Sequence, residues 1–122
     1  MSGERSANTL GTSRGYPPAV FSATHTEATG STNTVVSAVA GKRIAVIALS
    51  VSGGNSTGGL VKFLNDNGSD LWRGFVSTSS PIAHTAPSGG FLFQANTSTA
   101  LNVDNNSGAN AHINVAYVLE DP

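Results

Sequence analysis

One run of thirteen residues decides the fold of this chain: GKRIAVIALSVSG, from Gly41 to Gly53. In an extended strand, alternate side chains point to opposite faces, so the two sets can be assessed separately. The even positions carry Ile44, Val46, Ala48 and Ser50, and the odd positions carry Ala45, Ile47, Leu49 and Val51. Because both faces are largely apolar, the strand must be covered on both sides. The run therefore predicts a central strand of a two-layer sandwich, or a strand whose outer face meets another subunit.

On either side of this run, short extended segments alternate with turns. The predicted strands span 19–26, 32–40, 60–64, 71–76, 90–94, 100–104 and 111–119, with a short one near 82–83. Asn67-Gly68 is the strongest hairpin signal in the chain, and NNSGAN at 105–110 is predicted to be a hairpin loop between the last two strands. The last strand should bury Ala111, Ile113, Val115, Tyr117 and Leu119. About eight strands without a helical window predict an antiparallel sandwich or barrel.

Composition excludes several classes of protein. The 122 residues carry a formal charge of −1 and no cysteine, and 11% of them are charged, where about 25% is usual. We therefore expect neither nucleic-acid binding nor a disulfide framework. No apolar stretch approaches the ~20 residues of a membrane helix, and the first residues lack a signal-peptide core. We expect synthesis in a cytoplasm and no membrane partner.

The first sixteen residues differ from the rest of the chain. They show no hydrophobic periodicity and contain Arg5 and Arg14 among Ser, Gly and Asn. We interpret residues 1–16 as a flexible N-terminal arm and residues 17–122 as the β-sandwich domain, with Pro17 and Pro18 at the entrance. Arg5 and Arg14 are candidate anchors on a neighbouring protein.

No motif in the chain predicts catalysis, a metal or a cofactor. The three histidines lack the short spacing of zinc sites, although His112 is a candidate for a ring around the axis of a trimer. GGNSTGG lacks the Lys that follows the last glycine of a phosphate-binding loop. No G-x-S-x-G occurs, and few carboxylates are available to face each other across a cleft. The sequence predicts a protein that is not an enzyme.

With the strands laid out, one family resemblance emerges. TNTVVSAVAGKRIAVIALSVSG, then Lys62, LWRGFV and SGGFLFQANTSTALNVDNNSGANAHINVAYVLED follow in an order that resembles small jelly-roll proteins of tailed bacteriophages. The resemblance covers about residues 30 to 119. It consists of hydrophobic spacing together with Gly41-Lys42, Ala100-Leu101-Asn102 and Tyr117.

The resemblance implies a jelly-roll-like β-sandwich and a virion structural protein, of the capsid decoration or cement type. Such a protein would lie on the outer capsid surface, bind the major capsid protein and form a homotrimer. Arg5 and Arg14 are then the candidate capsid contacts. The candidate subunit-interface residues are Ile47, Leu49, Val51 and Tyr117. No catalytic residue comes with the family.

The alternative is a receptor- or glycan-binding β-sandwich module of a phage tail or fibre. Sugar rings stack on exposed indoles, so Trp72 is the candidate stacking residue and Arg73 a candidate hydrogen-bond donor. Large apolar groups are usually buried, however. If Trp72 points into the core, this alternative loses its main support.

Overall fold

Nine strands follow one another along residues 19–122, which are the residues that this computed structural model describes. Their bounds are β1 Phe21–Glu27, β2 Ser31–Val36, β3 Arg43–Gly53, β4 Gly59–Asn65, β5 Asp70–Val76, β6 Ile82–Thr85, β7 Phe93–Gln94, β8 Leu101–Asn106 and β9 Ala111–Glu120. Each strand overlaps a predicted one, because alternation and turn residues mark the same segments. No helix among these residues is long and apolar enough to span a membrane.

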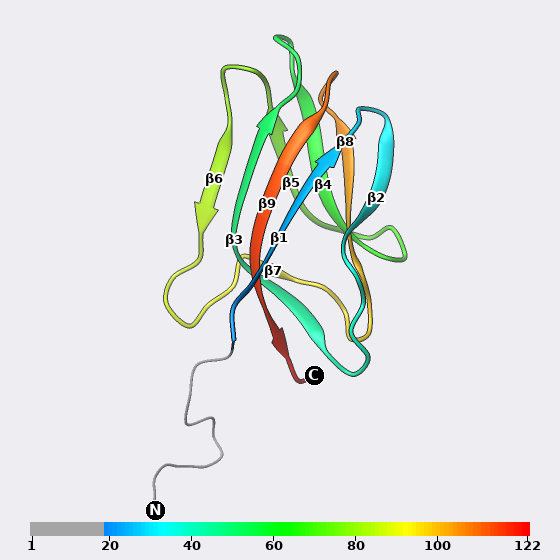
Figure 1. The fold of residues 1–122 in the computed structure, drawn as a ribbon, viewed down its shortest axis with the longest axis vertical. Coiled ribbons are helices and arrows are strands. Elements are labelled where there is room, and N and C mark those ends of the chain that lie inside the picture. The colour runs from blue at the N-terminus through cyan, green and yellow to red at the C-terminus, as the bar shows by residue number, and fades with distance from the viewer. Residues whose placement is uncertain (1–18) are drawn as a thin grey trace, which may run out of the picture.

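The strands form two antiparallel sheets packed face to face (Figure 1). One sheet has the order β1-β9-β3-β6, with the short β7 also paired to β3, and the other has the order β2-β8-β4-β5. The late strands β9 and β8 are thus inserted between early ones, β9 between β1 and β3 and β8 between β2 and β4. This interleaved, double-sheet order is that of a jelly roll. The predicted fold class is confirmed.

A β-bulge at Ile47 determines which residues of β3 face the core. Val46 pairs with Tyr117 and Ala48 pairs with Ala116, so Ile47 is an extra residue on β3. An extra residue reverses the alternation beyond it. The core face of β3 therefore carries Ile44, Val46, Leu49 and Val51. The apolar even positions before the bulge and the apolar odd positions after it thus lie on the same, core-facing side of β3. This accounts for part of the apparent two-faced apolar pattern in the sequence.

The bulge lies where β3 changes neighbours. The part of β3 that precedes the bulge in the sequence pairs with β7, and the part that follows the bulge pairs with β6. The backbone N–H of Ala86 donates to the Ile47 carbonyl at 2.7 Å, and that of Leu92 donates to the Val46 carbonyl at 2.7 Å. The loop between β6 and β7 is therefore attached to β3 at both of its ends.

The two predicted hairpins have different outcomes. The turn at Asn67-Gly68 joins β4 to β5 in one sheet, with Gly68 at a φ of 90° and its N–H donating to the Asn65 carbonyl at 2.8 Å. This prediction is confirmed. The NNSGAN segment is not a hairpin loop, because β8 and β9 belong to different sheets. Its turn residues reverse the direction of the chain, but the chain then enters the other sheet and does not pair with β8.

The core lies between the two sheets and is centred on Phe63, which is fully buried. Its ring centroid lies 5.5 Å from that of Trp72 and 5.4 Å from that of Phe93. The predicted inner face of β9 is confirmed: Ala111, Ile113 and Val115 are buried in the core, and Tyr117 and Leu119 pack against it. The predicted arm, residues 1–16, lies outside the described residues.

Candidate functional site

The outer face of the β1-β9-β3-β6 sheet is the candidate functional site. Its paired strands bring small neutral side chains into three rows. The first row is Ser22, Ala116, Ala48 and Thr85, the second is Thr24, Asn114, Ser50 and Ala83, and the third is Thr26, His112 and Ser52. We call these eleven residues the neutral face. None of them is Asp, Glu, Lys or Arg, so a partner could cover this face without desolvating an ionised carboxylate, ammonium or guanidinium group.

Hydrogen bonds between neighbouring strands order parts of the neutral face. The Asn114 amide donates to the Ser50 hydroxyl at 3.3 Å, and Thr26 Oγ1 lies 3.4 Å from His112 Nδ1. Most side chains in the rows are short. The face therefore has little side-chain entropy to lose when a partner covers it, which favours association.

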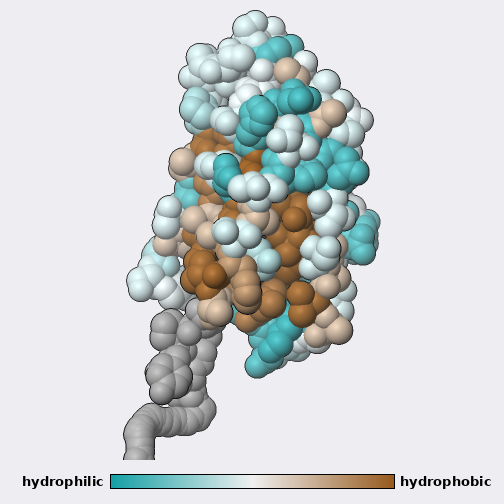
Figure 2. All heavy atoms as spheres, in the orientation of Figure 1, coloured by the Kyte–Doolittle hydropathy of each residue, from teal (hydrophilic) through white to brown (hydrophobic). Residues whose placement is uncertain are grey.

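An apolar groove opens at one end of the neutral face. It has a volume of about 280 Å³, and its apolar lining includes Val20, Ile47, Pro87 and Val118. Figure 2 shows hydrophobic residues gathered over the lower half of this sheet, whereas the upper half is mostly white and teal. Val20 is 60% exposed. Exposed apolar groups that cluster beside a neutral surface are typical of interaction sites.

The loop between β6 and β7 forms one wall of the groove. At its tip the Gly90 N–H donates to the Pro87 carbonyl at 2.9 Å, and Gly89 has a φ of 79°. A positive φ at the third residue is typical of a type II turn, for which glycine is the favoured residue. Because both ends of the loop are hydrogen-bonded to β3, this wall has a fixed position relative to the floor.

A charged pair lies at the same end of the sheet. Arg43 and Glu120 are register partners on β3 and β9. The Arg43 guanidinium donates to the Gln94 side-chain carbonyl at 3.1 Å, and the Gln94 amide donates to a Glu120 carboxylate oxygen at 2.7 Å. Glu120 also lines the groove. The groove therefore combines an apolar floor with one carboxylate at its rim.

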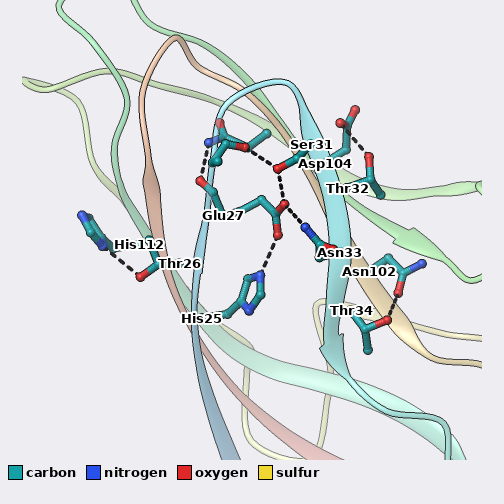
Figure 3. A network of polar contacts seen from close by, with 12 residues as sticks. His25, Thr26, Glu27, Ser31, Thr32, Asn33, Thr34, Asn102, Asp104 and His112 are labelled. Atoms are coloured by element: carbon teal, nitrogen blue, oxygen red, sulfur yellow. Dashed lines mark hydrogen bonds and ion pairs between the residues drawn. The ribbon is translucent and has the colours of Figure 1, made fainter.

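A buried carboxylate, Glu27, lies at the edge where β1 meets β2 (Figure 3). Ser31 donates its hydroxyl hydrogen bond to Glu27 Oε2, and the Asn33 amide donates to the same oxygen at 2.5 Å. His25 Nε2 lies 2.6 Å from Glu27 Oε1. Burial by itself raises the pKa of Glu27. The hydrogen bonds from Ser31, His25 and Asn33 together lower this pKa by more than burial raises it, so the net shift is downward.

The Glu27 cluster contains a serine, a histidine and a carboxylate, but their order does not activate the serine. In a hydrolytic triad the histidine takes the proton of the serine and the carboxylate orients the histidine. Here the carboxylate lies between the other two and accepts from both. The contacts instead join β1 of one sheet to β2 of the other, so we interpret the cluster as structural.

The structure corrects two of the four predicted subunit-interface residues, Leu49 and Val51. Leu49 and Val51 are 3% and 0% exposed and lie in the core between the sheets, because the bulge at Ile47 turns them inward. Tyr117 is on the inner face of β9 and stacks on Phe21 at a centroid distance of 5.5 Å. Of the four candidates, only Ile47 lines the groove. The two capsid-contact candidates, Arg5 and Arg14, lie outside the described residues.

Trp72 packs against the core, as its size predicted. Its ring centroid lies 6.3 Å from that of His84 on the facing sheet edge. Arg73 is on the opposite side of β5, is exposed and donates to Asp70. The two residues therefore do not form one sugar-binding surface.

No group of three or more His, Cys, Asp or Glu side chains within residues 19–122 is placed to hold a metal ion. His112 is exposed on the neutral face. His25 contacts Glu27, and His84 is the histidine beside Trp72. The three histidines thus make different side-chain contacts.

The sequence-based predictions did not include the burial of Glu27. A usable signal was present, because Phe21, Ala23, His25 and Glu27 share one parity along β1. Ala23 packs on the core, so its parity mates also point inward. The groove gave no comparable signal, since residues from four separate segments line it.

Comparisons of the chain with models of protein families, with characterised proteins and with solved structures find no match.

Proposed function

We propose that this chain is a structural protein of a bacteriophage virion, which binds the outer capsid shell as a homotrimer and stabilises it. The observation that carries the proposal is the neutral face with its adjoining groove. The centre of a protein interface is depleted of charged residues relative to the remaining surface. The neutral face shares this one feature, because it has no Asp, Glu, Lys or Arg, and the apolar groove beside it adds a hydrophobic contact area.

The jelly roll alone does not decide between functions, because capsid proteins, lectins and cupins share it. Three features support assembly over glycan binding. The groove is mainly apolar, Trp72 packs against the core, and the neutral rows lie on one sheet face. The resemblance to phage decoration proteins points the same way.

In this proposal, copies of the chain contact one another through the neutral face and the groove. Residues 1–16 reach the shell, with Arg5 and Arg14 as the candidate contacts to the major capsid protein. A protein that binds the assembled shell and not its dissociated subunits stabilises the shell by mass action. At a free concentration of 100 times the Kd, each site contributes about 2.7 kcal/mol.

The test measures binding of the purified protein to empty shells of the phage that encodes it, by co-sedimentation and by the mass of the free protein in light scattering. Unaltered protein should be trimeric and should saturate the shells. Ser22→Arg places a charge on the neutral face and should lower both the mass and the occupancy. Thr34→Arg, at an exposed position on β2 of the other sheet, is the matched control and should change neither.

Deletion of residues 1–14 tests the role of the arm in shell binding. It should lower shell occupancy because it removes Arg5 and Arg14. Unchanged occupancy would remove the arm from the mechanism. A chain that stays monomeric and leaves shells bare, but gives specific hits on a glycan array, would favour the receptor-binding alternative.

A further inference from the structure

The groove lies where the undescribed part of the chain joins the described part. Val20 lines the groove, and residues 1–18 connect to it through Ala19 alone. Whatever occupies the groove therefore lies close to the point at which this segment begins. The nearest aromatic residue in that segment is Tyr16, in the sequence Arg14-Gly15-Tyr16-Pro17-Pro18.

We infer that the groove binds Tyr16 from the N-terminal segment of a second copy of this chain. The inference rests on the self-association in the proposed function and is independent of shell binding. The floor, made by Ile47 and Val118, suits an aromatic ring, and Thr85 and Ser88 provide polar groups at the rim for its hydroxyl. Aromatic side chains that fill pockets are the commonest anchors of protein interfaces.

The lining of the groove favours an amphipathic side chain as its occupant. At about 280 Å³, the groove lies at the small end of the range of about 300–1,000 Å³ that is usual for ligand pockets. Its lining is mainly apolar, and in residues 19–122 Glu120 is the only charged residue that lines it. An amphipathic aromatic group such as tyrosine matches this lining.

Charge complementarity supports the same occupant. Residues 19–122 contain four Lys or Arg and six Asp or Glu, a net charge of −2, whereas residues 1–18 contain Arg5, Arg14 and Glu4, a net charge of +1. In an extended segment, residues two apart point to the same side. Arg14 would therefore approach the sheet together with Tyr16, and Glu120 lies at the rim to receive it. This assignment leaves Arg5 as the shell contact.

The two prolines favour a second copy over the chain's own segment. Proline fixes its own φ, and the residue before a proline is extended. Pro17 and Pro18 separate Tyr16 from Val20 in the sequence, so a chain whose Tyr16 entered its own groove would have to bend back at two residues whose φ is fixed. A Tyr16 from a neighbouring copy meets no such restriction.

The absence of cysteine allows a direct test in the full chain. Gly15→Cys places a thiol beside Tyr16, and Ser88→Cys places one on the exposed loop that lines the groove. Chains carrying Gly15→Cys and a mass tag are mixed with Ser88→Cys chains and oxidised. A disulfide-linked product of both masses is expected. Thr34→Cys, exposed on the other sheet, replaces Ser88→Cys as the control and should give little of that product.

Variants of Tyr16 test whether its aromatic ring is responsible for the cross-linking between two chains. Adding Tyr16→Ala to the Gly15→Cys chain should lower the yield of the mixed product by about tenfold, whereas Tyr16→Phe should preserve it. Cross-linking no better than in the Thr34→Cys control would overturn the inference. So would a Gly15→Cys/Ser88→Cys double variant that links only within one chain. Efficient cross-linking by a protein that leaves shells bare would refute shell binding and leave this inference intact.

Discussion

The indole of Trp72 lies against Gly74 on the inner side of β5. A Cβ atom added at Gly74 would lie 2.5 Å from Trp72 Cη2 and 2.6 Å from the Cδ1 of Ile82 on β6. Both distances are too short for carbon atoms. Glycine at position 74 thus makes room for the indole between the facing edges of the two sheets.

Replacing this glycine should strain the core. Gly74→Ala is expected to lower the free energy of unfolding by about 1–3 kcal/mol, as overpacking usually does. Denaturant unfolding followed by circular dichroism measures the change. Trp72→Phe removes the atom that clashes most closely, so the double variant Trp72→Phe/Gly74→Ala should be more stable than the sum of the single effects predicts. Strict additivity would show that the indole is not the obstacle.

The buried Glu27 should make stability depend on pH. Its pKa in the folded chain is lowered from the unfolded value of about 4.3. The carboxylate therefore contributes stability that is fully present above the unfolded pKa and is lost as the pH falls through the folded pKa. Glu27→Gln should be less stable than the unaltered chain at pH 7, and the difference should shrink toward pH 3. A difference that grows on acidification would contradict the downward shift.

The bulge at Ile47 predicts opposite behaviour for two neighbouring apolar residues. Leu49→Ala should cost about 2–5 kcal/mol of stability, because it opens a cavity in the core. Ile47→Ser, which alters a partly exposed groove residue, should cost less than about 1 kcal/mol but should reduce self-association. Denaturant unfolding and light scattering distinguish the two effects. A large loss of stability for Ile47→Ser would place Ile47 in the core instead.

The Asn105 side chain is fully buried and should be needed for the crossing between the sheets. Its amide donates to the carbonyls of Glu27 and Ala109 at 2.8 and 2.9 Å, and its Oδ1 accepts from the Ser107 N–H and hydroxyl. Asn105→Ala leaves these groups without a partner and should cost about 2–4 kcal/mol, whereas Ser107→Ala, which removes one hydroxyl, should cost about 1 kcal/mol. Equal costs would show that the amide is not the centre of the network.

Local patterns in the sequence predict the position of most strands and turns. Alternation marked the strands and the inner face of β9, and Asn67-Gly68 marked the β4–β5 turn. These features depend on neighbouring residues alone, because side chains alternate along any extended strand and glycine permits a positive φ. The size of Trp72 likewise sufficed to predict that it packs against the core.

The sequence by itself therefore determined where the strands run and that they form an antiparallel sandwich or barrel. Only the tertiary structure decided which face of β3 each residue occupies, because the bulge at Ile47 arises where β3 passes from β7 to β6. It also decided that the segment 105–110 crosses between sheets, since both layers must exist before a turn can join them. The groove has the same origin. Its lining comes from Val20 just before β1, from β3 and β9, and from the end of β6 with the loop that follows it. Alternation along one strand carries no information about which distant strands become its neighbours.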